Sequence, residues 1–258
     1  MRRIAYNLYT IFLFTSSDIK TMILPSIAFA LSHSTHLSKY TLVSRLPLML
    51  LYTWINLLAF TINNQCSHRS IAEDTLNKPW RPIPSARVSA THARTLGIIS
   101  IPVSILVGAL IGGGITQSVL IAILGIYYNY LGGGSAHWVI RNALNAIGFV
   151  SFASGTLEVA LQASIPFPIF PWIALIAVLI GSTVHVQDMY DQIGDAAAGR
   201  RTFPLVVGDA AARRCIALVI MFWTVSCPAY WGAGILGFLA PMLIGGWEEG
   251  NLLVSAPT

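Results

Sequence analysis

Apolar residues fill this chain in long runs, and short polar or glycine-rich breaks separate the runs. A helix needs about 20 predominantly apolar residues to cross the core of a bilayer, so each run predicts a membrane-spanning helix. We expect eight spans, at about residues 18–32, 41–62, 95–111, 119–131, 138–161, 170–186, 210 onward and 231–247. Residues 1–17 are amphipathic and predict a lead-in on the membrane surface before the first span.

Composition then sets the class of protein. Of 258 residues, 55% are hydrophobic and only 10% are charged, whereas a soluble domain has about 25% charged residues. We therefore expect an all-α, polytopic transmembrane helical bundle that forms a single domain over residues 1–258. The net charge of +5 forms no basic stripe, so we expect no nucleic-acid partner, and no obligate protein partner is indicated. Cys66, Cys215 and Cys227 lack metal-ligand spacing and predict no disulfide framework.

The distribution of basic residues predicts the orientation in the membrane. With the N-terminus inside, the outside carries only Lys39 and Arg45. The inside carries Arg2, Arg3, Lys20, Arg69, Lys78, Arg81, Arg87, Arg94, Arg141, Arg200, Arg201, Arg213 and Arg214. This asymmetry places two long polar segments, residues 63–94 and 187–209, on the cytosolic side after the second and sixth spans. Their spacing indicates two pseudo-repeated four-helix halves. We expect an integral membrane protein of the endoplasmic reticulum with both segments facing the cytosol.

Three acids in the second polar segment are the first candidate for chemistry. Asp188, Asp191 and Asp195 are spaced by three and four residues, which places them on one face of a helix. Carboxylates that repel one another favour a bound cation, and oxygen ligands alone suit Mg²⁺. Because Mg²⁺ also binds substrate phosphates, a diphosphate is the expected third component. The alternative interpretation is a solvated helix end with no ligand.

The first polar segment offers a matching set of groups. Three prolines, Pro79, Pro82 and Pro84, interrupt any helix there and stiffen the loop. Possible oxygen ligands are Asn63, Asn64, Gln65, Glu73 and Asp74, and possible anion contacts are Arg69, Lys78, Arg81 and Arg87. Arginine binds phosphate with two parallel hydrogen bonds and lysine acts as a point charge. A plain linker between spans is the alternative, but adjacent acids, ordered bases and three prolines favour a functional loop.

These motifs resemble those of the UbiA superfamily of intramembrane prenyltransferases. The second family motif, DxxDxxxD followed by a glycine and TxP, is matched in full by Asp188, Asp191, Asp195, Gly199, Thr202 and Pro204. The first motif, NDxxDxxxD followed by a basic RPxP stretch, is matched in part by Asn64, Glu73, Asp74 and the run KPWRPIP at 78–84. Gln65 stands where the motif has aspartate, and the middle aspartate has no clear counterpart. The resemblance implies a bundle of typically nine spans.

A narrower resemblance is to the fungal branch of this superfamily, which is similar to membrane-bound terpene cyclases. It rests on SDIKTMILP at 17–25, the run EDTLNKPWRPIP, and YNYLGGG followed by RNALNAIG within 128–148. The resemblance implies that Mg²⁺ is held by Asp74, Asp188, Asp191 and Asp195, the catalytic set, together with Asn64 and Glu73. It implies diphosphate contacts from Lys20, Lys78, Arg81 and Arg141. Asn64, Tyr128 and Arg201 are further candidate substrate contacts. A lysine that the family carries early in the fifth span corresponds here to Arg141, with His137 as the competitor.

Three functions remain open from the sequence. The first is Mg²⁺-dependent ionisation of a prenyl diphosphate, with farnesyl diphosphate as the expected substrate, followed by cyclisation within a water-free bundle. The second keeps the ionisation and transfers the prenyl group to an aromatic or other small acceptor. The third is a transporter, which the gathering of charges at one membrane face disfavours. Candidate aromatic liners of the cavity are Trp54, Tyr127, Tyr128, Tyr130, Phe149 and Phe152. Glu158 is either functional or a residue of the outer boundary.

Overall fold

The computed structural model describes residues 2–254, and for residues 247–254 it describes the backbone alone. All regular elements in this range are helical. The α-helices are α1 Arg2–Thr15, α2 Leu24–Ser32, α3 Lys39–Asn64, α4 His68–Asn77, α5 Ala90–Ile111, α6 Ile115–Tyr130, α7 Trp138–Leu161, α8 Phe170–Thr183, α9 Asp188–Ala197, α10 Phe203–Val207, α11 Asp209–Tyr230 and α12 Ile235–Val254. A π-helical turn, Ile19–Ile23, precedes α2, and 3₁₀ turns cover Gly133–Ser135, Phe167–Ile169 and Val184–Val186.

Five helical segments of the described range are long and apolar enough to cross a membrane: α3, α5, α7, Phe167–Val186 and α11. A sixth is obtained if α1 and the segment Ile19–Ser32, which are bent by 58° relative to each other, count as one broken span. The apolar part of α12, Ile235–Gly246, is shorter. The expected helices are therefore present, but only five or six of them meet the length and hydropathy expected of a span. The two pseudo-repeated halves remain a prediction.

Serine residues cap the N-terminal ends of three consecutive helices, α3, α4 and α5. The side chains of Ser38, Ser67 and Ser89 accept hydrogen bonds from backbone N–H groups in the first turns of α3, α4 and α5. Each of these bonds satisfies an N–H group that has no partner within its own helix. The polar segment 63–94 thus contains α4 between two loops, and its two ends belong to α3 and α5.

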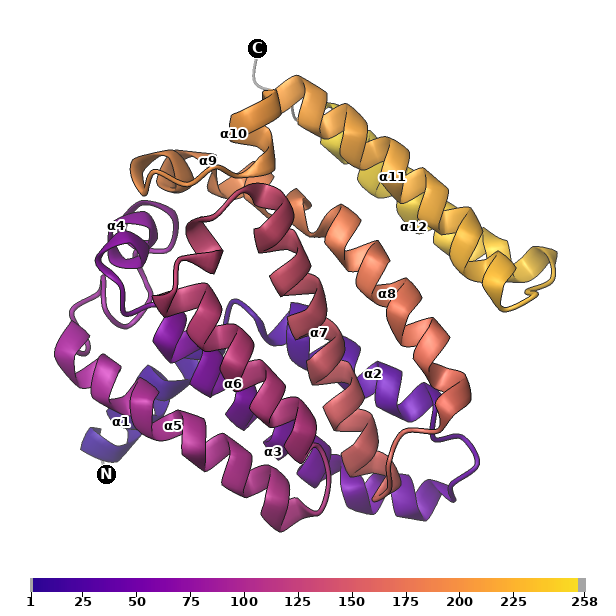
Figure 1. Cartoon of the computed structure of the whole chain (residues 1–258), viewed down its shortest axis with the longest axis horizontal. Helices are drawn as coiled ribbons and strands as arrows, with labels where there is room; N and C mark the ends of the chain where they lie inside the picture. Colours follow the sequence, from indigo (N-terminus) through magenta and orange to yellow (C-terminus); the bar gives the residue numbers. More distant parts are fainter. Residues whose placement is uncertain (1, 255–258) are drawn as a thin grey trace.

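Helix α3 lies at the centre of the bundle, where it packs against α5, α6 and α7 (Figure 1). Helices α2 and α8 both pack against α7. The antiparallel pair α11 and α12 packs beside α8, at the edge of the bundle that is orange to yellow in Figure 1. Most of the first half of helix α1 is exposed, and Phe14 in its last turn is buried against α3.

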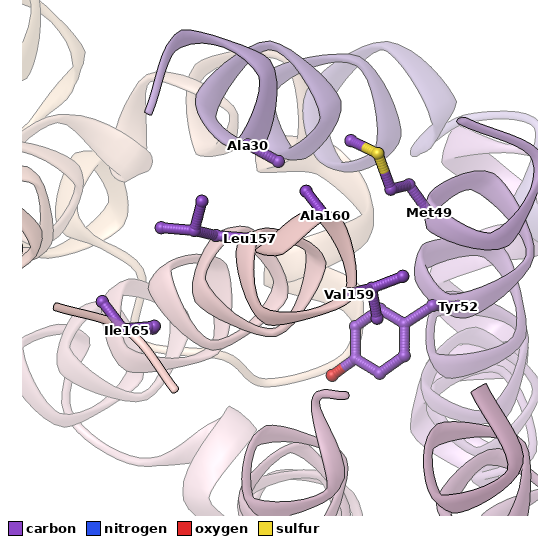
Figure 2. Close-up of a cluster of buried hydrophobic side chains, with 7 residues drawn as sticks. All are labelled: Ala30, Met49, Tyr52, Leu157, Val159, Ala160 and Ile165. Carbon is purple, nitrogen blue, oxygen red and sulfur yellow. The ribbon is translucent and has the colours of Figure 1, made fainter. Parts of the chain in front are cut away.

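A buried apolar cluster locks α2, α3 and α7 together at the end of the bundle that lies away from α4 and α9. It comprises Ala30, Met49, Tyr52, Leu157, Val159, Ala160 and Ile165 (Figure 2). The Tyr52 hydroxyl donates to the Gly114 carbonyl at 2.9 Å. Gly114 has a φ of 77°, and a Cβ there would lie 2.5 Å from the Tyr52 ring. Only glycine fits such a position, so this packing fixes the α5–α6 turn.

Glu158 belongs to the same end of the bundle. Its carboxylate accepts the N–H of Gly114 at 3.1 Å. Glu158 therefore anchors the α5–α6 turn, far along α7 from the acidic segments, which agrees with the interpretation of a boundary residue.

Candidate active site

The two acidic helices, α4 and α9, pack against each other at one end of the bundle (Figure 1). The Asn77 side chain joins them, because it donates to the Asp191 carbonyl at 3.1 Å and accepts the N–H of Gly194 at 3.2 Å. A Cβ on Gly194 would lie 2.3 Å from the Asn77 amide nitrogen, so glycine is what allows this close approach. The expectation that the two polar segments lie at the same end of the bundle is confirmed.

Each acid of α9 is paired with a base from another segment. Asp188 bonds to Arg141 of α7 at 2.5 Å, and Asp191 bonds to Lys78 at 2.9 Å. Asp195 lies 3.4 Å from Arg200, which follows the C-terminal end of α9. Asp188 and Asp195 are buried, and Asp191 is half-buried.

The acids of α4 are paired in the same manner. Asp74 accepts from one Arg81 nitrogen at 2.8 and 3.0 Å, through both of its oxygens. The other terminal nitrogen of Arg81 donates to Ser17 at 3.0 Å, which ties the loop to the N-terminal segment. Glu73 bonds to Arg200 at 2.7 Å, so Arg200 links the two acidic helices.

Burial dominates the protonation of these carboxyls. It raises the pKa of Glu73 to about 7 and that of Asp195 to about 6, against the lowering effect of Arg200 on both groups. Burial also raises the pKa of Asp74, although Arg81 acts in the opposite direction. Buried carboxyls are costly to ionise unless a cation compensates them. This arrangement therefore favours the binding of further positive charge.

A cavity opens beside the two acidic helices and descends between α3, α6, α7 and the π-helical turn. It encloses about 950 Å³ of space between atoms, its open mouth included. Its polar end is lined by Asp18, Asn64, Glu73, Lys78, Arg81, Arg141, Gln187, Asp191 and Arg200. Its deeper part is mostly apolar and aromatic, with Met22, Phe60, Ile121, Leu124, Tyr128, Leu144, Phe149 and Phe152.

The donor set fits a hard cation together with a polyanion. Among the side chains that the structure describes, residues 2–246, no three acidic, histidine or cysteine groups are arranged to hold one ion, and the carboxylates are paired with basic side chains instead. The buried oxygens Asp188 Oδ2 and Asp195 Oδ2 nevertheless have no hydrogen-bond partner in this range, and neither do the Arg81 and Arg200 Nε–H groups. Carboxylate oxygens suit Mg²⁺, and guanidinium N–H groups suit phosphate.

The structure brings most predicted site residues to this cavity. Asp74, Asp188 and Asp195 lie immediately behind its polar lining, where they bond to Arg81, Arg141 and Arg200. Lys20 is exposed and lines an adjoining open hollow together with Lys78 and Asp191. Residues predicted for the site that line the cavity itself are Asn64, Glu73, Lys78, Arg81, Tyr128, Arg141 and Asp191.

Arg201 is a predicted substrate contact that lines neither the cavity nor the adjoining hollow. Its side chain is exposed, whereas that of its neighbour Arg200 is largely covered and lines the cavity. The cause is the turn after α9: Gly199 has a φ of 66°, and the Arg200 N–H bonds to the Asp195 carbonyl. Two consecutive arginines carry no sequence signal that distinguishes them.

Arg141 and His137 differ in their place relative to the cavity, and so do the aromatic candidates. Arg141 lines the cavity, whereas His137 is exposed and accepts a hydrogen bond from the N–H of Val139 at the start of α7. Of the aromatic candidates, Tyr128, Phe149 and Phe152 line the cavity. The others lie elsewhere: Trp54 in a packed cluster, Tyr127 and Tyr130 exposed.

Fold and site together define an all-helical membrane protein with a cavity that is charged at one end and aromatic in its depth. The chain belongs to the UbiA prenyltransferase family, whose family model matches residues 21–248.

Its relatives include the fumagillin beta-trans-bergamotene synthase of Aspergillus fumigatus, which is 30% identical over 87% of this chain and 75% of that protein. The diterpene cyclase eriG and the polyprenyl transferase eriF of Hericium erinaceus are each 31% identical, over 94% and 85% of this chain and 77% and 75% of theirs.

A solved structure of a UbiA homolog from Archaeoglobus fulgidus, bound to DMAPP and Mg²⁺, has the same fold. The TM-score is 0.65 at 18% identity, over 98% of this chain and 84% of that one. This likeness extends over almost the whole bundle.

Proposed function

We propose that this chain ionises a prenyl diphosphate with the help of Mg²⁺ and cyclises the chain to a terpene, with release of pyrophosphate. We infer farnesyl diphosphate as the substrate. The main support is that the lining of one cavity carries the unsatisfied Nε–H groups of Arg81 and Arg200, while unsatisfied oxygens of Asp188 and Asp195 lie immediately behind this lining. A Mg²⁺–diphosphate complex satisfies both kinds of group at once.

In this proposal Mg²⁺ is held by Asp188, Asp191 and Asp195 of α9, with Asn64, Glu73 and Asp74 contributing from the first polar segment. When bound, Mg²⁺ neutralises charge on the diphosphate and makes it a better leaving group.

Four basic side chains of the lining act on the anion. Lys78, Arg81, Arg141 and Arg200 are paired with carboxylates. On substrate binding they exchange these partners for diphosphate oxygens, while the carboxylates turn to the cation. The number of charge-assisted contacts is thereby conserved.

The chemical step is a heterolytic cleavage. The bond between C1 of the prenyl chain and the diphosphate oxygen breaks, and pyrophosphate leaves with both electrons. A double bond of the same chain attacks the allylic cation and leaves a new cation, which loses a proton from a neighbouring carbon to the released pyrophosphate. The walls formed by Phe149, Phe152 and Tyr128 exclude water, and their aromatic faces stabilise the cation.

Intermolecular prenyl transfer is the second candidate, because the polyprenyl transferase eriF is as similar to this chain as the cyclase eriG. An acceptor then traps the cation in place of the substrate's own double bond.

The test is incubation of the purified protein in lipid nanodiscs with farnesyl diphosphate and Mg²⁺ and no acceptor. Pyrophosphate release with a cyclic hydrocarbon or alcohol detected by gas chromatography supports the cyclase. Release that requires an added acceptor supports the transferase. Uptake into vesicles without pyrophosphate release refutes both.

The orientation is also part of the proposal. The excess of basic residues at this end of the bundle supports a site that faces the cytosol, in the endoplasmic reticulum. Accessibility of an engineered cysteine at position 201 to a membrane-impermeant reagent, in sealed microsomes, tests it.

A further inference from the structure

A second hollow lies behind one wall of the cavity, in the space between α3, α5 and α6. We call it the side hollow and define it by Ala59, Ile101, Ser104, Ala122 and Ile126. It encloses about 300 Å³ between atoms, its open mouth included. Its lining is mostly apolar, so its natural occupant is hydrocarbon.

The side hollow and the cavity share two wall residues, Phe60 of α3 and Ile121 of α6. The ring of Phe60 packs on Gly125, where an added Cβ would lie 3.4 Å from Phe60 Cδ2. The ring also lies beside Tyr128, with 6.0 Å between the centroids. At this level, Phe60 of α3 and Tyr128 of α6 therefore fill the space between the two helices.

Elsewhere the apolar end of the cavity is closed by more than one layer of side chains. Met22, Ile23, Leu57 and Phe152 form one buried cluster with the shared wall residue Ile121, and each of these side chains is less than 9% exposed. Phe60 packs against this cluster but is only partly buried, and it lines the side hollow as well. A path through the cluster requires several side chains of a packed core to move, whereas a path into the side hollow requires mainly Phe60 to be small. A prenyl tail too long for the cavity therefore has an easier course sideways, through the position of Phe60.

We propose that Phe60 limits the length of the isoprenoid that the cavity accepts, and that the side hollow receives the distal end of a longer chain when the side chain at position 60 is small. The proposal rests on the proposed function, because it concerns the tail of the same substrate. Phe60 is a specificity-determining residue in this account. It lies one helical turn from Asn64 of the polar end, so it faces the tail and not the diphosphate.

The experiment compares geranyl, farnesyl, geranylgeranyl and geranylfarnesyl diphosphates, with pyrophosphate release as the readout for purified protein in nanodiscs. Phe60→Ala should shift the preferred substrate to a chain one isoprene unit longer. The ratio of kcat/KM for that longer chain over the wild-type optimum should rise roughly tenfold or more, by analogy with pocket-size discrimination. Ala122→Phe fills the side hollow, so the double variant Phe60→Ala/Ala122→Phe should return to the wild-type preference.

Phe149→Ala is the matched control, because Phe149 lines the cavity but not the side hollow. Any change of preference in that variant should persist when Ala122→Phe is added. If Phe60→Ala does not fold, Ile121→Ala opens the same wall from α6 and should give the same reversible shift.

The outcomes separate the two claims. No turnover of any prenyl diphosphate by the wild type refutes the proposed function. Turnover by the wild type with an unchanged length preference in both wall variants, or a shift that Ala122→Phe does not reverse, refutes the role of Phe60 and leaves the proposed function standing.

Discussion

Arg200 joins the two acidic helices, so its removal should destabilise the ligand-free protein in a way that depends on pH. Its terminal nitrogens lie 2.7 Å from Glu73 and 3.4 Å from Asp195, and its side chain is 10% exposed. Arg200→Gln keeps the polar character but removes the positive charge between two buried carboxylates. Both acids should then have pKa values above the wild-type values of about 7 for Glu73 and about 6 for Asp195.

The sign of the effect follows from proton linkage. A carboxyl whose pKa is raised on folding stabilises the folded state when it is protonated, and this stability is lost as the pH rises through its folded-state pKa. In the wild type this loss ends near pH 6 for Asp195 and near pH 7 for Glu73. In Arg200→Gln this loss of stability continues to higher pH. The free energy of unfolding falls by about 1.4 kcal/mol per pH unit for each carboxyl that still titrates. The total loss of stability in Arg200→Gln should not exceed the roughly 3–5 kcal/mol that is typical of a broken buried ion pair.

Thermal unfolding at about pH 6, 7 and 8 measures this effect. Each kcal/mol lost from the free energy of unfolding lowers the melting temperature by about 2–4 °C. We expect a small deficit for Arg200→Gln at the lowest pH and about 6–12 °C at the highest, for a loss of ~3 kcal/mol. Arg201→Gln is the matched control, because Arg201 is exposed. Equal melting temperatures for the two variants at every pH would refute the bridging role of Arg200.

Three further predictions concern the metal, the protons and the core. Asp191→Asn should lower Mg²⁺-dependent pyrophosphate release roughly 100-fold or more without preventing membrane insertion, by analogy with removal of an electrostatic stabiliser; near-normal turnover contradicts the metal assignment. Because protons compete with Mg²⁺ for Glu73 and Asp195, the apparent Mg²⁺ affinity in titration calorimetry should rise with pH up to about 7 and then level off; a flat profile would exclude these ligands. Tyr52→Phe should lower the free energy of unfolding by about 0.5–1.5 kcal/mol and leave kcat unchanged, because it removes one of the two hydrogen bonds to the buried Gly114 carbonyl, which keeps that from the Ser118 N–H; a loss of activity without a loss of stability would show that the two ends of the bundle are coupled.

Local patterns in the sequence were sufficient for most of the helices and for the acidic set. The spacing of Asp188, Asp191 and Asp195 requires only the period of a helix, and the structure has α9 there. The basic residues predicted that the two polar segments share one end of the bundle. This prediction needs only an even number of spans between the two segments, and no knowledge of how the helices pack.

Other features depend on contacts between distant segments. The pairing of Glu73 with Arg200 joins residues 127 positions apart, and it follows from the packing of α4 on α9. The choice of Arg200 over Arg201 depends on the turn at Gly199. The number of spans is hard to predict for a different reason: hydropathy marks an apolar run, but α1 and α2 show that such a run can be bent by 58°.

The central claim is that α4 and α9 hold one cation together with a diphosphate. Electron paramagnetic resonance of Mn²⁺, titrated in the presence of the unreactive analogue farnesyl S-thiolodiphosphate, tests it directly. We predict that the wild type binds Mn²⁺ and that Glu73→Gln on α4 and Asp191→Asn on α9 each weaken binding roughly tenfold or more, as expected for loss of a ligand or of its support. Unchanged Mn²⁺ affinity in either variant would contradict the claim that both helices contribute to one metal site.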